Sequence, residues 1–320
     1  MKSSIKSART MESLAETYLA ERRSLGFDLK ISGQVLMNFA HFADTASHRA
    51  PITESLVLAW AHSTPSGRAI TWARRIEVIR PFAKYLKQYY PDTIVPRGDL
   101  CGRAHRRLAP HIYTERELDE LLTASAAMLP AGSIRPLTYE ALFGLIAATG
   151  LRISEAINLS RDDVNPADGT LIVRETKFHR SRLIPLHSTV TLALKHYAAR
   201  RALVIATEPC NSFFVNRDGK KLRSSTVHWA FGRLREQLGW VARGDHALPR
   251  IHDLRHSFVC RRILTWYQDG VNVDHHMMAL STYLGHVKPS DTYWYLTAVP
   301  DLMEIVSQKF ARFAEGGRHE

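Results

Sequence analysis

Apolar residues recur at steps of three and four through the first part of the chain, the spacing that aligns them on one face of an α-helix. The pattern starts at Met11 and Leu14 and continues after Thr53, whose hydroxyl can cap a third helix. A fourth helix is predicted over residues 68–89. We therefore predict a helical N-terminal domain at residues 8–92, with no strand in it.

The second part of the chain combines helical and extended patterns. Thr114 and Glu117 have the spacing of a capping box at a helix start, and Gly150 can end a buried helix by taking the left-handed conformation. Short apolar runs at residues 171–173 and 183–186, joined by a basic turn, predict a β-hairpin. Further helices are predicted at residues 118–122, 139–148, from 153, from 224, at 254–266 and at 302–313. The predicted fold is mainly α with a small antiparallel β-sheet.

Helical periodicity fails between Pro91 and Pro110, where arginines outnumber acidic residues. This composition is typical of a solvated connection rather than of a packed element. We predict a basic linker at residues 93–112, followed by a mixed α/β domain at residues 113–320.

The charge balance favours a polyanionic partner. Lys and Arg outnumber Asp and Glu by 43 to 31, which gives a net charge of +12 and a pI near 9.8. Nucleic acid is the first candidate. Arginines in the fourth helix and in the linker suit a DNA backbone, although a solvated helix face or a solvated linker has the same composition. The candidate DNA-binding residues are Arg74, Arg75, Arg103, Arg106 and Arg107.

Neither a membrane nor a secretory route is indicated. The best apolar run, residues 141–151, is far shorter than the ~20 residues that a spanning helix needs. Residues 1–10 are basic and polar with no apolar segment behind them, which does not fit a secretory signal. Cys101, Cys210 and Cys260 are far apart and odd in number, so we expect buried reduced thiols. These features favour the cytoplasm.

The most informative feature is an ordered series of short motifs in the second domain. Each motif alone is weak, and their order makes the set specific. The series is Ala148-Thr149-Gly150-Leu151-Arg152-Ile153-Ser154-Glu155, then Lys177, then His252-Asp253-Leu254-Arg255-His256, then Leu284-Gly285-His286, then Tyr295. It resembles the catalytic domain of the tyrosine recombinase (phage integrase) family, and the helical first domain resembles that family's core-binding domain.

This resemblance implies cleavage and rejoining of DNA through a covalent 3′-phosphotyrosine, with no metal or other cofactor. Arg152 and Arg255 are the predicted phosphate clamp, because guanidinium is permanently charged and its forked donors match phosphate oxygens. His252 precedes Arg255 by three residues, which places both on one face of a helix. It can bind the same phosphate or assist deprotonation of the tyrosine.

Two further basic residues complete the implied phosphate site. Lys177, in the hairpin turn, is the candidate general acid for the leaving 5′ oxygen, although Arg180 or Arg182 can also fill that position. His286 follows a Leu-Gly pair and is expected to donate another hydrogen bond to the phosphate.

Tyr295 is the candidate nucleophile, because its offset from His286 matches the family pattern. Tyr293 is the rival, and packing in the core is the ordinary role of either ring. Glu155 resembles an acidic family position that orients a catalytic basic group, and a surface ion pair with Arg152 is the alternative.

The chain after Arg255 is longer than in compact family members. The additional stretch contains Asp274, His275 and His276, but it has no HxxxH or HExxH spacing, so we expect no metal site. Residues 274–296 are similar to integrases of mobile elements that encode several recombinases in tandem, the recombinase-in-trio type. That similarity implies integration or transposition, with companion recombinases as further partners.

The last predicted helix, at residues 302–313, has one apolar stripe. It can pack on its own domain or, as the family implies, dock on a neighbouring protomer of a tetramer that holds paired inverted half-sites. Two other classes of function stay open. The first is a non-catalytic DNA-binding architectural or regulatory protein, although simple binding would not require a complete set of nucleophile and phosphate-binding residues. The second is a metal-dependent phosphodiesterase, which cleavage that resists EDTA would exclude.

Overall fold

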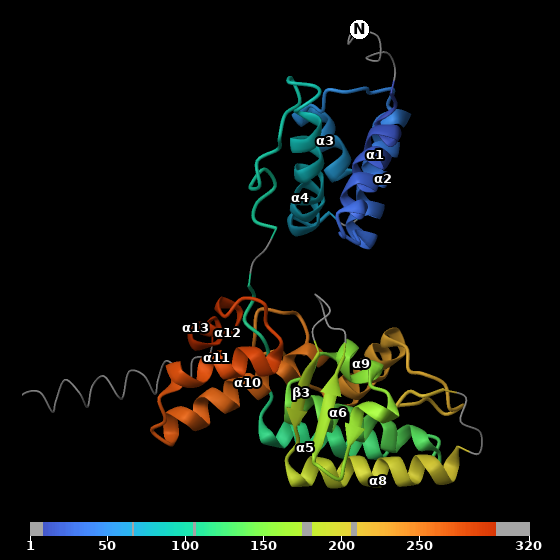
Figure 1. The fold of residues 1–320 in the computed structure, drawn as a ribbon, viewed down its shortest axis with the longest axis vertical. Coiled ribbons are helices and arrows are strands. Elements are labelled where there is room, and N and C mark those ends of the chain that lie inside the picture. The colour runs from blue at the N-terminus through green and yellow to red at the C-terminus, as the bar shows by residue number, and fades with distance from the viewer. Residues whose placement is uncertain (1–8, 66, 105–106, 175–180, 206–209, 299–320) are drawn as a thin grey trace, which may run out of the picture. The chain divides into compact units, whose positions relative to one another are not determined.

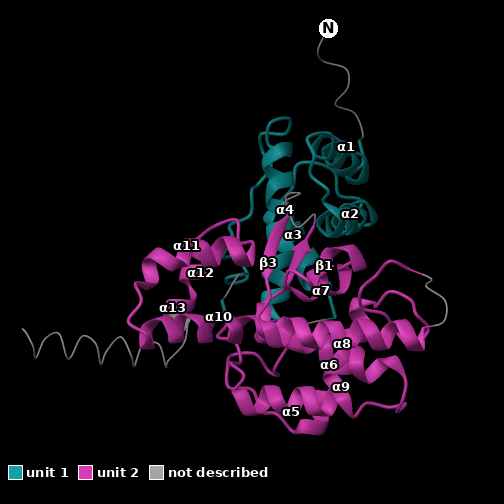
Figure 2. Cartoon of the chain, turned by 60° about the horizontal axis from the view of Figure 1, so that its bottom comes forward, with its two compact units in different colours: residues 1–107 teal, residues 108–320 magenta. Residues whose placement is uncertain are grey.

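The computed structural model describes residues 9–65, 67–104, 107–174, 181–205 and 210–298. The chain separates into two compact units, residues 1–107 and residues 108–320 (Figure 2). Some predictions fall outside the described residues, and these concern Arg106, Lys177, Arg180 and the helix at residues 302–313.

The first unit is a bundle of helices around one apolar core (Figure 1). Its helices are α1 (Met11–Ser24), α2 (Lys30–Thr45), α3 (Glu54–His62) and α4 (Ala69–Leu86). Phe39 and Trp60 meet edge to face in the core, with ring centroids 5.3 Å apart. Thr53 caps α3 as predicted, because its hydroxyl accepts the Leu56 N–H at 3.3 Å. The described residues of this unit contain no strand.

The stretch predicted as a linker is divided between the two units. Thr93 is buried, and the Ile94 N–H donates to the Ile52 carbonyl at 2.9 Å, so this part packs on the first unit. Farther along, the Ala109 N–H donates to the Asp245 carboxylate at 2.9 Å, which attaches that segment to the second unit. Each end of the connection is therefore held by the unit beside it.

The second unit is built around α6, a helix buried on most of its faces. Its helices are α5 (Glu115–Ala126), α6 (Ile134–Thr149), α7 (Ile153–Asn158), η1 (Arg161–Asp163), α8 (Ser188–Val204), α9 (Ser224–Leu238), α10 (Ile251–Gln268), α11 (Val273–Leu284), α12 (Ser290–Tyr293) and α13 (Tyr295–Ala298). The predicted capping box of Thr114 and Glu117 opens α5. Gly150 ends α6 at φ 66°, and a Cβ there would lie 2.6 Å from the ring of Phe258.

A three-stranded antiparallel sheet lies beside these helices (Figure 1). Its strands, in spatial order, are β1 (Val164–Asn165), β2 (Thr170–Val173) and β3 (Arg182–Pro185). In the predicted hairpin, Leu171 pairs with Ile184 and Val173 pairs with Arg182. The structure thus confirms a mainly α fold with a small antiparallel sheet.

The sequence pattern did not predict α8, α11 or the short elements η1, β1, α12 and α13. Helix α8 buries only a narrow stripe that includes polar side chains, such as Thr191 and Arg201, so its apolar periodicity is weak. The expectation of three buried thiols was also wrong: Cys260 is buried, whereas Cys101 and Cys210 are partly exposed. Within the described residues, no helix is long and apolar enough to cross a membrane.

Candidate active site

Helix α10 carries three basic side chains of the motif series on one face. His252, Arg255 and His256 follow one another at steps of three and one, so the first and last are four residues apart. Asp253 fixes the start of this helix: it is fully buried and accepts the Arg250 backbone N–H at 2.8 Å and the Arg250 Nη2 at 2.6 Å. One well-capped helix therefore positions all three bases.

Arg255 is a buried cation that holds several segments together. Its Nη1 donates to the Gly150 carbonyl at 2.7 Å, and its Nη2 donates to the Leu284 carbonyl at 2.8 Å and to His286 Nε2 at 3.0 Å. Burial, with the nearby charge of Arg152, lowers the pKa of Arg255 to about 10, so it stays charged at neutral pH. Among the described carboxylates, none forms an ion pair with it.

Glu155 lies in a buried ionic network with two arginines. It accepts the Arg152 backbone N–H and Nη1, both at 2.9 Å, and Arg182 Nη1 and Nη2 at 3.1 and 2.8 Å. Arg182 Nε also donates to the Tyr283 carbonyl at 2.8 Å. Burial acts to raise the pKa of Glu155, but the hydrogen bonds and charge of Arg182 outweigh it and hold that pKa below its usual value. The carboxylate is not part of a surface ion pair.

His286 follows Gly285, which ends α11 in the left-handed conformation. Because Arg255 can only donate, His286 Nε2 accepts, and the ring proton therefore lies on Nδ1, 2.7 Å from the buried Thr292 hydroxyl. Burial and the charge of Arg255 lower the pKa of His286 to about 4. In this arrangement the neutral imidazole supports Arg255, and its Nε2 has no proton to give to a phosphate.

Tyr295 begins α13 and is 2% exposed, whereas Tyr293 is 37% exposed. The Tyr295 hydroxyl lies 2.8 Å from His256 Nδ1. Burial raises the pKa of Tyr295 to about 12, although the charge of Arg255 acts in the opposite direction. The structure thus brings one of the two rival tyrosines, and not the other, to the basic face of α10.

His252 lies at the exposed edge of the same face. Its ring packs edge to face on the His256 ring, with centroids 4.7 Å apart. Desolvation by the surrounding protein and the charges of Arg255 and Arg250 lower the pKa of His252 to about 4. At neutral pH it is an uncharged imidazole.

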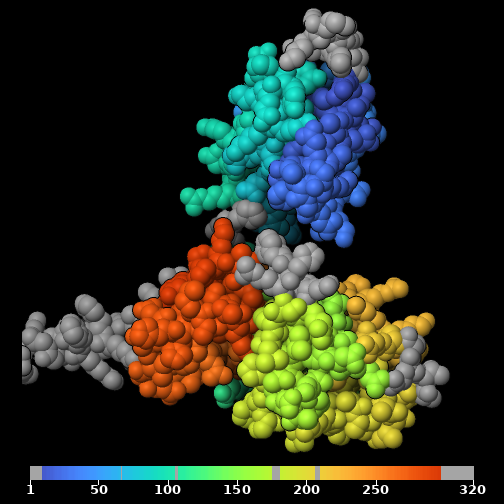
Figure 3. Space-filling model, viewed as in Figure 1, coloured from blue at the N-terminus to red at the C-terminus, as the bar shows by residue number. Residues whose placement is uncertain are grey.

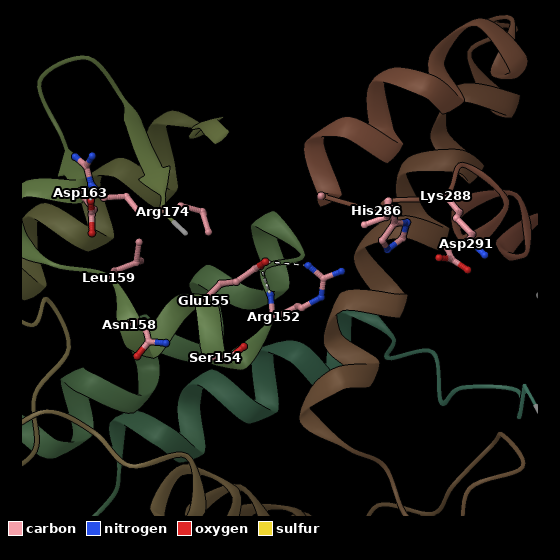
Figure 4. Close-up of a pocket in the computed structure, with 13 residues that line it drawn as sticks. Arg152, Ser154, Glu155, Asn158, Leu159, Asp163, Arg174, His286, Lys288 and Asp291 are labelled. Carbon is pink, nitrogen blue, oxygen red and sulfur yellow. Dashed lines mark hydrogen bonds and ion pairs between the residues drawn. The ribbon is translucent and has the colours of Figure 1, made fainter. Parts of the chain in front are cut away.

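A cleft of about 730 Å³ opens beside Arg152. Its walls come from two segments that are distant in sequence, residues 152–174 in the yellow-green part of Figure 3 and residues 285–291 in the orange-red part. Figure 4 shows Arg152 between Glu155 on one wall and His286 on the other. The basic side chains of the lining are Arg152, Arg174, His286 and Lys288. The lining also contains the carboxylates of Glu155, Asp163 and Asp291.

The model of the phage integrase family matches residues 112–300. The chain belongs to the phage integrase family. A putative integrase/recombinase of Sinorhizobium fredii, y4rB, is 34% identical over 307 residues, covering 95% of this chain and 98% of the relative. A second one, y4rE, is 34% identical over 97% of this chain and 98% of its own length. The tyrosine recombinase XerC of Pelotomaculum thermopropionicum is 29% identical, over 80% of each chain.

Solved structures of other integrases share the fold. The Tn1549 transposon integrase, in complex with circular intermediate DNA, aligns with a TM-score of 0.67 at 17% identity, covering 94% of this chain and 100% of that one. The XerH recombinase bound to a palindromic difH substrate aligns with a TM-score of 0.60 at 18% identity, covering 90% and 81%.

The structure of this integrase brings most of the sequence-predicted site residues together. Arg255 contacts His286, and Arg152 contacts Glu155. Tyr295 lies against the α10 face, and Lys177 is outside the described residues. Their catalytic roles remain predictions at this point.

Sequence reasoning gave no role to His256, and it treated Arg182 only as a substitute for Lys177. His256 stands four residues after His252, so helical spacing alone could have placed both on one face. The contact of Arg182 with Glu155 had no local signal, because the two residues are 27 positions apart and in different elements.

The proposed DNA-binding arginines differ in their surroundings. Arg74 and Arg103 are exposed, whereas the Arg75 guanidinium lies over the Trp60 ring, 3.9 Å from its centroid, and donates to the Ser63 hydroxyl. Within the described part of the chain, no group of three or more His, Cys, Asp or Glu side chains is arranged to hold a metal.

Proposed function

We propose that this member of the phage integrase family, a site-specific DNA recombinase, cleaves and rejoins DNA through a covalent 3′-phosphotyrosine on Tyr295 and needs no metal. One observation carries the proposal. The Tyr295 hydroxyl contacts His256 on the same face of α10 that carries Arg255, which is itself held by the Leu284 carbonyl and His286. A tyrosine beside a fixed guanidinium is suited to attack a phosphate that the guanidinium binds.

Charge on the phosphate is the main problem in this reaction. Attack at phosphorus places additional negative charge on the non-bridging oxygens, and in our proposal the cations Arg152 and Arg255, each held by hydrogen bonds, stabilise it. His286 and the two backbone carbonyls hold the Arg255 fork, so little reorganisation is needed when the phosphate arrives. In our proposal His286 therefore acts through Arg255 and does not itself donate to the phosphate.

The proposed steps balance without a cofactor. The Tyr295 oxygen forms a bond to phosphorus and gives its proton to His252, the proposed base, while the bond from phosphorus to the 5′ oxygen breaks. Lys177, as the proposed general acid, gives that oxygen a proton. A 5′ hydroxyl of a partner strand then attacks the phosphotyrosine, which reseals the DNA and restores the tyrosine.

The two units suit a clamp on double-stranded DNA. We assign the first unit as core-binding domain and the second as catalytic domain, with four protomers on paired inverted half-sites. The solved relatives are described as bound to DNA, and one is a transposon integrase, which supports integration or transposition of a mobile element as the role of this protein. Companion recombinases are further proposed partners.

A nicked suicide substrate, from which the cleaved 5′ fragment diffuses away, tests the nucleophile. The unmodified protein should accumulate a covalent protein–DNA adduct in EDTA. Tyr295→Phe should form none while still binding the same DNA, and the matched control Tyr293→Phe should form it normally. An adduct that persists in Tyr295→Phe and disappears in Tyr293→Phe would reverse the assignment, and a requirement for metal would exclude the mechanism.

A further inference from the structure

His256 is in direct contact with the Tyr295 hydroxyl. The motif series gave this histidine no role. Its Nδ1 lies 2.8 Å from the Tyr295 oxygen, and the imidazole is half-buried. Trp294 packs edge to face on both rings, with centroids 5.9 Å from His256 and 5.2 Å from Tyr295. Aromatic rings therefore restrict His256, and the contact is not one of two freely rotating side chains.

The direction of this hydrogen bond follows from the charges around it. The Arg255 guanidinium acts on the Tyr295 oxygen, and a hydroxyl near a cation turns its oxygen toward that cation and its hydrogen away from it. The acceptor on the other side is His256 Nδ1. The Tyr295 O–H thus donates to the imidazole, and the oxygen lone pairs are left for the phosphate that Arg255 binds.

We propose that His256 is a positioning residue for the nucleophile: it accepts the Tyr295 hydroxyl hydrogen and thereby aims the oxygen at the phosphate. This inference rests on the proposed role of Tyr295. His256 and Arg255 are adjacent on α10, and both act on the Tyr295 oxygen.

Full proton transfer to His256 is a different role, and the electrostatics oppose it. His246, His252, Arg250 and Arg255 surround the imidazole, and desolvation together with these groups lowers the pKa of His256 to about 2. Burial raises the pKa of Tyr295, so both shifts oppose transfer of the proton from the tyrosine to the imidazole. Orientation therefore accounts for the contact, and the proton leaves by another route.

The test compares three variants by the first-order rate of adduct formation at saturating protein. His256→Ala removes the acceptor, and it should slow cleavage about 10- to 100-fold, the usual result of misaiming a reacting atom, with an unchanged Kd for DNA. His256→Asn places an amide oxygen near the Nδ1 position and should restore most of the rate. The matched control is His275→Ala, which removes an exposed histidine of α11 and should change nothing.

A substrate with sulfur in place of the bridging 5′ oxygen separates the nucleophile from the general acid. A thiolate leaves without a proton, so a defect at Lys177 should disappear on this substrate, whereas the His256→Ala defect should persist. The dependence of the rate on pH should keep the same shape in the unmodified protein and in His256→Asn. If the pH–rate profile of His256→Asn lacked one of the pH-dependent limbs of the unmodified protein, His256 would be the group that accepts the Tyr295 proton, contrary to our proposal.

Several results would overturn the inference without affecting the proposed nucleophile. Cleavage by His256→Ala at the normal rate would show that His256 does not position Tyr295. Faster cleavage would show that the hydrogen bond between His256 and Tyr295 restrains the nucleophile. Equal losses in His256→Ala and His256→Asn, with a matching drop in thermal stability, would show a packing role. The proposed function itself fails if the unmodified protein forms no adduct at Tyr295 or forms it only with a metal.

Discussion

Two arginines of the site, the partly buried Arg182 and the buried Arg255, are held in opposite ways. Arg182 is neutralised by Glu155, with two hydrogen bonds of 3.1 and 2.8 Å, and its remaining contact is the Tyr283 carbonyl. Arg255 is 1% exposed and binds two carbonyls and a neutral imidazole, with no ion pair to a described carboxylate. The Arg182 network therefore contains its own counterion, Glu155, whereas the Arg255 network contains none among the described residues.

This difference teaches which part of the site is structural and which is prepared for a ligand. An unpaired buried charge costs stability, and a protein keeps one where an incoming anion compensates for it. Arg255 lies where the proposed phosphate would complete its coordination. Arg182 and Glu155 need no ligand, and they join β3, α7 and the end of α11 into a fixed wall for Arg152.

The largest expected effect is on cleavage by Arg255→Lys. The Gly150 and Leu284 carbonyls and His286 take three of the five Arg255 donors, so a lysine with three donors would have none left for phosphate. The adduct rate should therefore fall on the order of 10²–10³. Arg182→Lys keeps a cation next to Glu155 and should lose much less. Single-turnover adduct formation on the suicide substrate measures both. A similar loss of adduct rate in the two variants would contradict the distinction between Arg255 as a phosphate ligand and Arg182 as a structural cation.

The next effect is on the stability of the compensated network. Glu155→Gln leaves Arg152 and Arg182 facing an uncharged amide in a buried place, and the free energy of unfolding should fall by about 3 kcal/mol. Urea denaturation measures this value. The control is Glu236→Gln, which removes an exposed ion pair with Arg233 at 3.1 Å and should change stability by less than about 0.5 kcal/mol. A Glu155→Gln protein as stable as the control would show that the network is not structural.

The same carboxylate gives a smaller, pH-dependent effect. The pKa of Glu155 in the folded protein lies below its usual value of 4.5, so its stabilisation is complete above that pH. It is lost as the pH falls from about 4.5 through the folded pKa, because the unfolded state takes up the proton first. The stability difference between the unmodified protein and Glu155→Gln should therefore shrink on acidification below pH 4.5. A constant difference from pH 7 to pH 3 would contradict the assigned ionisation.

The sequence predicted the local features of this fold well. Caps at Thr53 and Thr114 and the glycine at Gly150 depend on near neighbours, so periodicity and turn chemistry locate them. The ordered motifs also identified most of the residues that meet on α10. The 27-residue separation between Glu155 and Arg182 has no such local signal, and it could not be predicted. The direction of the His286 hydrogen bonds depends on the charge of Arg255, which becomes decisive only once both are buried together.

The smallest expected effect concerns Gly285, which lets the compensated arginine approach the end of α11. A Cβ at this position would lie 2.8 Å from Arg182 Nη1, and the backbone has φ 66°. Gly270 has a similar φ of 72° and open space around it, so Gly270→Ala measures the backbone penalty alone, about 1 kcal/mol. Gly285→Ala should lose more than that, and the excess reports the displacement of Arg182 from Glu155. The excess should vanish when Gly285→Ala is made in a protein that already carries Glu155→Gln, and an undiminished excess would mean that the clash acts outside this network.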